Sequence, residues 1–122
     1  MDLFVDASFP ASIAQVRSQG LQLHRWSGER VGDLALVKEA ARSAVGGVIF
    51  LGIQPLLSSA IRTAARDDGL FVAGTVEQGP FEAMRLVGNL LGSIERAAAR
   101  PGCYKLLVRE VRLWADLGDS IS

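Results

Sequence analysis

Short apolar runs alternate with polar, glycine-containing segments along the chain. Residues 3–5, 21–24, 48–51 and 70–73 are such runs and are expected to be strands, and the β-branched and aromatic content of residues 48–51 is typical of a buried strand. Residues 104–114 are also strand-like and fit either two short strands or one bent strand. Residues 115–122 are expected to fray, so that residues 1–114 form a single domain in this interpretation.

The segments between these runs have the periodicity of amphipathic helices. Ser8 can cap a first helix that ends at Gly20, and Asp33 opens a second helix. Residues 55–67 predict a third helix, and Pro80 starts the longest one. The positions expected to face the core are Leu34, Val37 and Ala41 on the second helix, Leu57, Ala60, Ile61 and Ala64 on the third, and Phe81, Met84, Val87, Leu91 and Ile94 on the longest.

Strands that alternate with helices predict a mostly parallel sheet covered on both faces, which is a three-layer α/β/α sandwich. Such folds bind ligands in a crevice at the carboxyl ends of the strands, where the strand order reverses. Asp6 directly follows the first strand, and Asp33 begins the helix after the second strand. Although 27 positions separate them in the sequence, both acids are expected to face this crevice.

The composition narrows the class of protein. Apolar residues make up 49% of the 122 residues and charged residues 21%, which excludes a disordered chain. Lysine plus arginine equals aspartate plus glutamate at 13 each, so nucleic-acid binding through bulk positive charge is not expected, although a local basic patch stays open. The mean hydropathy of +0.26 is high for so small a chain and predicts an exposed apolar patch, and with it a homodimer or a partner helix on that surface.

Residues 43–61 carry no charge and are long enough to span a bilayer, but their glycines and Gln54-Pro55 divide them into a strand, a turn and a helix start. The N-terminus lacks the basic region of a signal peptide. Cys103 is the single cysteine, which excludes a disulfide within the chain and a cysteine-rich zinc site. We therefore expect a cytoplasmic protein without a membrane partner, in which Cys103 is inert.

Few residues carry a chemical signature of their own. The sequence holds no glycine-rich phosphate loop, which disfavours nucleotide-cofactor enzymes. His24 stands alone, and packing explains it more readily than catalysis. Arg25, Trp26 and Arg30 follow the second strand and, together with Ser8, are candidate contacts for single-stranded RNA, while Trp26 fits core packing or a partner interface equally well.

The opening stretch, residues 3–10, reads Leu-Phe-Val-Asp-Ala-Ser-Phe-Pro. It resembles the opening of PIN-like domains related to VapC-type toxins, in which a strand runs into an Asp-Glu-Asn-Leu-Pro-type sequence. Gly20 stands where that family has a glycine before its second strand, and Gly32-Asp33 resembles its second acidic position. The strand at 48–51 follows at similar spacing, and residues 108–113 resemble the late strand pair of the family. The resemblance covers most of the chain and implies a PIN-like fold.

PIN domains are Mg²⁺- or Mn²⁺-dependent ribonucleases in which three or four carboxylates hold the ions. The resemblance implies that Asp6 and Asp33 are the first two acids of this set, with metal-binding and catalytic roles. The third acid of the family follows the third strand, where this chain has Leu51-Gly52-Ile53. Glu77, just past the fourth strand, is the candidate replacement ligand.

The sequence departs from the family at two further positions, because Ala7 and Ser8 replace the usual Glu and Asn. Two carboxylates rarely suffice to hold Mg²⁺ tightly, so a degenerate PIN-like protein that acts as a binding or assembly module is favoured. The alternative is an active Mg²⁺- or Mn²⁺-dependent ribonuclease, the toxin of a toxin–antitoxin pair, with RNA as substrate and an antitoxin or other protein as partner. A regulator domain with Asp6 as phosphoacceptor ranks last, because the paired acids and the late lysine of such a site are missing.

Overall fold

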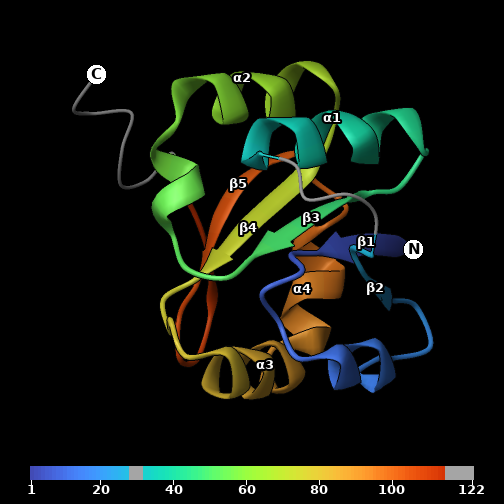
Figure 1. Ribbon diagram of the computed structural model, residues 1–122, viewed down its shortest axis with the longest axis vertical. Coiled ribbons are helices and arrows are strands. Elements are labelled where there is room, and N and C mark those ends of the chain that lie inside the picture. The colour runs from blue at the N-terminus through green and yellow to red at the C-terminus, as the bar shows by residue number, and fades with distance from the viewer. Residues whose placement is uncertain (28–31, 115–122) are drawn as a thin grey trace.

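A six-stranded sheet separates two layers of helices in the computed structural model, which describes residues 1–27 and 32–114 (Figure 1). Arg30 and the expected tail at 115–122 lie outside the described residues. The strand order is β2-β1-β3-β4-β5-β6, with β1 to β5 parallel and β6 antiparallel to β5. The strands are β1 (Asp2–Val5), β2 (Gln22–Arg25), β3 (Gly47–Phe50), β4 (Phe71–Thr75), β5 (Gly102–Leu106) and β6 (Val111–Leu113).

The helices lie on the two faces of this sheet. Helices α1 and α2 cover one face, and α3, α4 and the 3₁₀ helix η1 cover the other (Figure 1). None of the helices in the described part of the chain has the length and apolar character needed to cross a bilayer. The helical elements are η1 (Ala11–Gln15), α1 (Asp33–Arg42), η2 (Gln54–Leu57), α2 (Ser59–Asp67), α3 (Pro80–Asn89) and α4 (Leu91–Ala97).

The predicted three-layer α/β/α sandwich with a mostly parallel sheet is therefore confirmed. Successive side chains of a strand point to opposite faces, so each face has its own core. Leu3 and Val5 of β1 belong to the core shared with α3 and α4, whereas Phe4 packs into the core beneath α1 and α2. Burial on both faces explains why the inner strands are continuous apolar runs.

The first expected helix, from Ser8 to Gly20, is reduced to the single 3₁₀ turn η1. The chain returns to extended backbone at Val16, and Arg17 forms a bridge with Gln22 beside β2. Pro10 holds the N-cap position of η1, so the prediction that Ser8 caps this element is wrong.

The third and the longest expected helices are each divided in two. The side chain of Ser58 accepts a hydrogen bond from the backbone N–H of Ile61 (3.3 Å) and so caps α2, which separates it from η2. Leu90 interrupts the longest helix with φ −104°, and α3 ends before it while α4 begins after it. Residues 104–114 form two strands rather than one bent strand, with β5 starting two positions earlier at Gly102.

Several helical side chains that the sequence places in the core are not buried. Four positions expected to face the core are exposed: Leu34 (39%), Leu57 (53%) and Phe81 (65%), together with Ala60. Leu57 and Ala60 flank the break at Ser58, where a new helix starts with a new phase, whereas Leu34 and Phe81 lie in the first turns of α1 and α3. The buried helical positions are Leu36, Val37 and Ala40 on α1, Ile61, Ala64 and Ala65 on α2, Ala83, Leu86 and Val87 on α3, and Ile94 on α4.

The strand order places the reversal of the chain at β1. From β1 the chain adds β2 on one side and then β3, β4 and β5 on the other. The crossover connections after β1 and β3 therefore leave in opposite directions, and the carboxyl ends of these two strands flank the crevice where such sheets bind ligands.

Candidate functional site

Asp6 lies at the carboxyl end of β1, beside β3. Its backbone N–H donates a hydrogen bond to the carbonyl of Ile49 (3.0 Å), which continues the pairing of the two strands by one residue. Its side-chain Oδ1 accepts a hydrogen bond from the backbone N–H of Ser8 (3.0 Å), and its carbonyl accepts one from Phe9 (3.1 Å). Asp6 therefore organises the turn that follows β1 while its carboxylate stays partly exposed.

Arg25, at the end of β2, holds the same turn from the other side. Its Nε donates to the carbonyl of Phe9 (2.8 Å) and its Nη2 to the carbonyl of Ala7 (2.7 Å). A guanidinium that is engaged with two backbone carbonyls positions the loop of Asp6. The guanidinium that was predicted to contact RNA is therefore already used to hold this loop. Assigning helices and strands from the sequence could not reveal these hydrogen bonds.

Asp33 is the first residue of α1, and Gly32 occupies the N-cap position without a side-chain cap. Desolvation raises the pKa of the Asp33 carboxyl above its ordinary value, and the negative charge of Asp6 raises it further. The structure thus brings Asp6 and Asp33, the acidic pair, within electrostatic range of each other.

The carboxyl ends of β3 and β4 lie next to the acidic pair along the sheet. There a hydroxyl group and backbone groups form the polar contacts, in place of carboxylates. The hydroxyl of Thr75 accepts a hydrogen bond from the backbone N–H of Gly52 (3.0 Å) and donates one to the carbonyl of Glu77 (2.7 Å). Thr75 is completely buried. Gly52, Thr75 and Glu77, the threonine bridge, therefore join the loop after β3 to the loop after β4.

Two glycines make the threonine bridge possible. Gly52 has a φ of +84°, a conformation that side chains other than glycine rarely adopt. A Cβ on Gly74 would lie 2.4 Å from the carbonyl oxygen of Gly52, so only glycine allows the two backbones to approach so closely. The position where the resembled family carries its third acid is consequently a tight backbone turn.

The predicted three-acid metal site is not assembled within residues 1–27 and 32–114. No group of three or more Asp, Glu, His or Cys side chains lies close enough together there to hold a metal ion. Glu77 is tied to the site through its backbone carbonyl, and its residue is exposed. Among the described residues, the acidic pair thus has no third carboxylate beside it to complete a cation site.

The aromatic candidate Trp26 packs against the edge of the sheet. Its ring meets Phe4 in a T-shaped arrangement with centroids 5.4 Å apart, and both rings belong to the core beneath α1. An open cleft of about 700 Å³ lies beside these rings and is also lined by Asp2 and His24. Asp6 and Asp33 are not among its lining residues, so the described structure does not join Trp26 and the acidic pair in one pocket.

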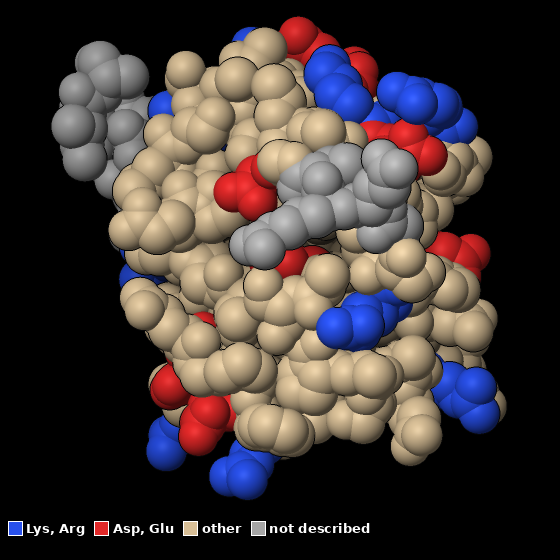
Figure 2. All heavy atoms as spheres, viewed as in Figure 1, with Lys and Arg blue, Asp and Glu red and all other residues tan. Residues whose placement is uncertain are grey.

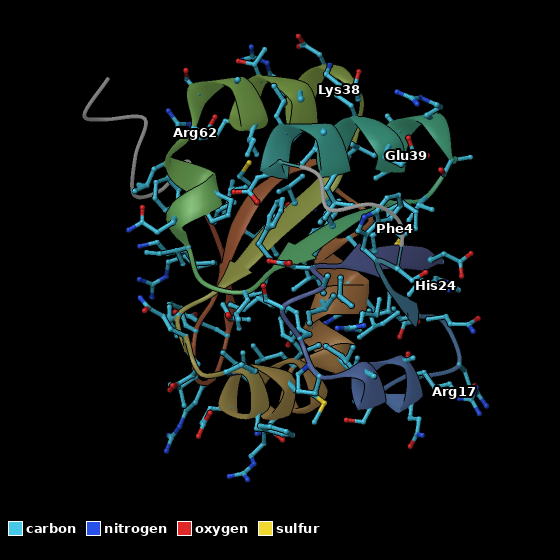
Figure 3. All side chains as sticks on the ribbon, in the orientation of Figure 1. Phe4, Arg17, His24, Lys38, Glu39 and Arg62 are labelled. Carbon is cyan, nitrogen blue, oxygen red and sulfur yellow. The ribbon has the colours of Figure 1, made fainter. Side chains whose placement is uncertain are left out.

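His24 and Cys103 lie in different environments, because His24 makes a surface contact whereas Cys103 is buried. Phe4 and His24 occupy paired positions on β1 and β2 (Figure 3), and the His24 Nε2 contacts Asp2 Oδ1 at 2.8 Å, a contact that lowers the pKa of Asp2. Burial raises the pKa of the Cys103 thiol to about 11, so it is un-ionised and unreactive at neutral pH.

Sequence reasoning missed the role of Thr75. A single hydroxyl residue that ends an otherwise apolar buried strand is a signal that could have drawn attention to it, because a buried hydroxyl needs hydrogen-bond partners.

Comparisons of the chain with protein-family models, with curated proteins and with solved structures find no significant match.

Proposed function

We propose that this chain is a PIN-like protein whose nuclease centre is degenerate, and that it acts as a binding or assembly module for another protein. The observation that carries the proposal is the composition of the crevice. The acidic pair supplies two carboxylates, and the adjacent position after β3 is the glycine of the threonine bridge. A small, strongly hydrated cation such as Mg²⁺ requires more negative charge than this pair provides.

The charge of the crevice also bears on the partner. Desolvation raises the pKa of Asp33 and the nearby charge of Asp6 raises it further, so the crevice holds two acidic side chains within electrostatic range of each other. Uncompensated carboxylates repel the phosphates of RNA. Arg25, at the end of the neighbouring strand β2, is engaged with the carbonyls of Ala7 and Phe9. These features favour a protein partner over RNA, and a cytoplasmic setting accords with the resemblance.

The alternative function is an active ribonuclease, the toxin of a toxin–antitoxin pair, and one observation favours it. Desolvation and the charge of Asp6 both raise the Asp33 pKa, and Asp6 and Asp33 would be the residues to hold a divalent ion, whose charge would offset the repulsion between them. Mg²⁺ or Mn²⁺ would then activate water and stabilise the charge that develops on the phosphate. This second candidate requires a further ligand, for which Glu77 remains the first choice.

A cleavage assay separates the two functions. Single-stranded RNA is incubated with Mn²⁺ and the wild-type chain, Asp6→Asn, Asp33→Asn, or the control Glu82→Gln on α3. Asparagine at position 6 keeps an oxygen that can accept the hydrogen bond from Ser8, so the turn is preserved while the charge is removed. We expect no cleavage above background by any variant and no shift in melting temperature when Mn²⁺ is added.

Cleavage by the wild type and by Glu82→Gln, abolished in both asparagine variants, would overturn the degenerate assignment and establish the nuclease. Cleavage that survives in both asparagine variants would instead point to a contaminant or to a site elsewhere on the chain, because a residue holding the ion is expected to be essential.

A further inference from the structure

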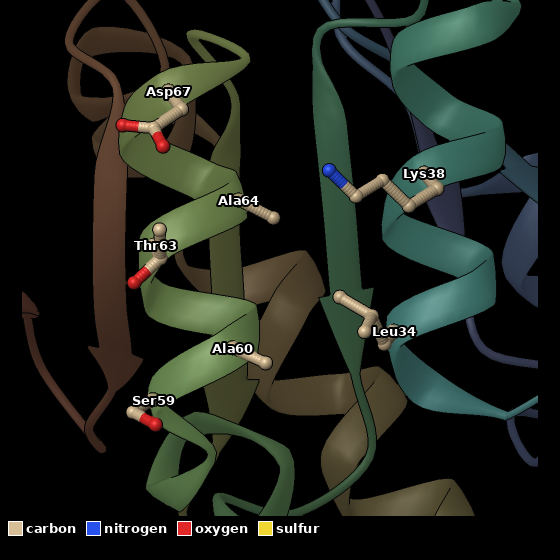
Figure 4. A pocket seen from close by; sticks show the side chains of 7 residues that line it. All are labelled: Leu34, Lys38, Ser59, Ala60, Thr63, Ala64 and Asp67. Carbon is tan, nitrogen blue, oxygen red and sulfur yellow. The ribbon is translucent and has the colours of Figure 1, made fainter.

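The surface over α1 and α2 uses its charges within the chain. Lys38 and Asp67 line a hollow of about 340 Å³ between the two helices (Figure 4). Lys38 Nζ contacts Asp68 Oδ2 at 3.3 Å, and Arg66 Nε contacts Asp67 Oδ1 at 3.5 Å. In the space-filling view, acidic and basic side chains accordingly stand next to one another at the upper end of the molecule (Figure 2). Each of these four charges thus has a partner of opposite sign inside the chain.

The cleft between α4 and β6 uses its charges differently. Its volume is about 560 Å³, and its charged lining residues are three arginines, Arg96, Arg100 and Arg112, and a single acid, Glu110. The Arg112 guanidinium contacts the Glu110 carboxylate, whereas Arg96 Nη2 donates a hydrogen bond to the neutral hydroxyl of Ser93 (3.3 Å). Within the described ranges of the chain, no carboxylate forms an ion pair with Arg96 or Arg100. The cleft is therefore positively charged.

Arg100 follows α4 and lies beside Tyr104 of β5. The Tyr104 hydroxyl donates a hydrogen bond to the Arg100 carbonyl (3.1 Å), and both residues line the cleft. Desolvation raises the pKa of the Tyr104 hydroxyl, and the positive charge of Arg100 opposes this rise, so the guanidinium lies within electrostatic range of the phenol. Glu95, the acid of α4, instead accepts a hydrogen bond from the Ser18 hydroxyl (2.9 Å) and is not among the lining residues.

The backbone of β6 offers a second set of polar groups beside this cleft. The carbonyl of Glu110 and the N–H of Trp114 form hydrogen bonds with β5 and the turn after it (2.8 and 2.6 Å). Backbone groups alternate in direction along an antiparallel strand, so the N–H and C=O groups of Val111 and Leu113 point away from β5. No strand of the described sheet lies beyond β6. Such an edge is a template on which an extended peptide adds a further strand.

The edge and the cleft act on the same side chains of an added strand. Val111 and Leu113 pack against the core shared with α3 and α4, so their side chains lie on the α4 face of the sheet. Directly opposed residues of an antiparallel pair have their side chains on the same face. The residues of an added strand that lie opposite Val111 and Leu113 would therefore point toward Arg96 and Arg100. Acidic residues at every second position of the added strand match this arrangement.

We propose that β6 and the adjacent cleft bind an extended acidic segment of another protein, which adds to the sheet as an antiparallel strand. Its backbone pairs with Val111 and Leu113, and its alternate carboxylates meet Arg96 and Arg100. The phosphates of a nucleic acid would engage the arginines alone and leave the outward backbone groups unused, so a peptide is favoured. Because β3, β4 and β5 separate β6 from β1, this site is distinct from the acidic pair and does not depend on what the crevice does.

A charge reversal tests the cleft. A fluorescently labelled peptide of alternating threonine and glutamate is titrated with the protein at about 50 mM salt, where charge attraction is little screened, and anisotropy is measured. We expect a dissociation constant of about 100 µM, and no measurable binding when lysine replaces glutamate. Arg100→Glu should weaken binding of the glutamate peptide roughly tenfold, because it places like charges together. Arg85→Glu, at an exposed arginine of α3 outside the cleft, is the matched control and should bind like the wild type.

Backbone methylation of the peptide separates strand addition from charge attraction alone. In the proposed register, the glutamate N–H groups point toward β6 and the threonine N–H groups point toward solvent. N-methylation of the glutamates should therefore weaken binding roughly tenfold, whereas N-methylation of the threonines should change it by less than about threefold. Both peptides carry the same charge, so a difference between them reports on the backbone pairing.

The results that would overturn the proposal are distinct from one another. A wild-type chain that does not bind the glutamate peptide at about 1 mM would exclude the site. Undiminished binding to Arg100→Glu would place the site elsewhere. Equal binding of the two methylated peptides would refute strand addition and leave the arginines to a phosphate-bearing ligand. Circular dichroism verifies that the variants are folded, which is expected because Arg85 and Arg100 are exposed.

Discussion

The acidic pair and the threonine bridge occupy the same edge of the same sheet but treat their polar groups in opposite ways. Asp6 and Asp33 present two carboxylates, and the Asp33 pKa is raised mainly by desolvation and further by the negative charge of Asp6. At the bridge, the buried hydroxyl of Thr75 uses both its donor and its acceptor capacity on backbone groups. The acidic pair thus keeps two like charges near each other, whereas the hydroxyl of the threonine bridge has a hydrogen-bond partner for both its donor and its acceptor.

This difference is the reason why we propose a binding role for the crevice rather than phosphate chemistry. Hydrolysis of a phosphodiester with metal ions needs carboxylates on both sides of the crevice to hold the ions. After β3 the chain has a glycine with φ +84°, and Gly74 on β4 admits no Cβ, so close backbone packing occupies this side of the crevice. Placing an acid at Gly52 would require the backbone there to change as well.

The largest expected effect comes from breaking the threonine bridge with Thr75→Val. Valine keeps the shape of threonine but leaves the backbone N–H of Gly52, which is buried, without its partner. We expect the free energy of unfolding to fall by about 2 kcal/mol in urea titrations. Thr63→Val, an exposed threonine on α2, is the matched control and should change stability by less than about 0.5 kcal/mol. Equal effects of both variants would mean that the bridge contributes no more than side-chain propensity.

A smaller loss of stability is expected at the acidic pair, from Arg25→Met, because Arg25 holds the turn that carries Asp6. Methionine keeps the apolar stem but removes the two hydrogen bonds to Ala7 and Phe9. Water can replace part of this interaction, so the loss of stability should be about 1 kcal/mol. The amide protons of Ser8 and Phe9, which bond to Asp6, should exchange faster with solvent in this variant. Arg17→Met serves as the control at an exposed arginine, and unchanged exchange in Arg25→Met would show that the turn needs no support from β2.

Much of the fold could be predicted from the sequence because strands that are buried on both faces appear in it as continuous apolar runs. The runs at 3–5, 21–24, 48–51 and 70–73 coincide with β1 to β4 within about one residue at most ends, since only apolar side chains fit between two helical layers. The helices were harder, because their ends depend on local hydrogen bonds. Ser58 satisfies the N–H of Ile61 and so restarts a helix that the apolar spacing alone would continue.

The candidate site was predictable only in part for a similar reason. Asp6 and Asp33 stand out because the acids come at a strand end and a helix start, and the topology then brings them to one edge. The engagement of Arg25 depends on carbonyl oxygens of Ala7 and Phe9, which any residue type carries. Likewise, the hydroxyl of Thr75 bonds to backbone atoms of Gly52 and Glu77, so the pattern of side chains in the sequence does not predict the threonine bridge.

The smallest expected effect, and the most direct probe of the acidic pair, is the pH dependence of Asp33. Its folded-state pKa lies above the ordinary value of 3.8, so its contribution to stability is full below that value and is lost as pH rises through the raised pKa. Asp33→Asn should therefore be more stable than the wild type at pH 7 by at most about 0.5 kcal/mol once solvent screening is included, and equal to it in acid. Asp2→Asn should instead be less stable than the wild type at pH 7, because His24 lowers the Asp2 pKa, and that stabilisation is present above 3.8 and lost as pH falls through the lowered value.

Asp6→Asn then separates the two causes of the raised Asp33 pKa, which are desolvation of Asp33 and the negative charge of Asp6. Desolvation is the larger cause, so carboxyl chemical shifts should show the Asp33 pKa falling in this variant while staying above 3.8. An Asp33 pKa that is the same in Asp6→Asn and in the wild type would show that the two carboxylates do not interact, and the acidic pair would then be two separate surface acids.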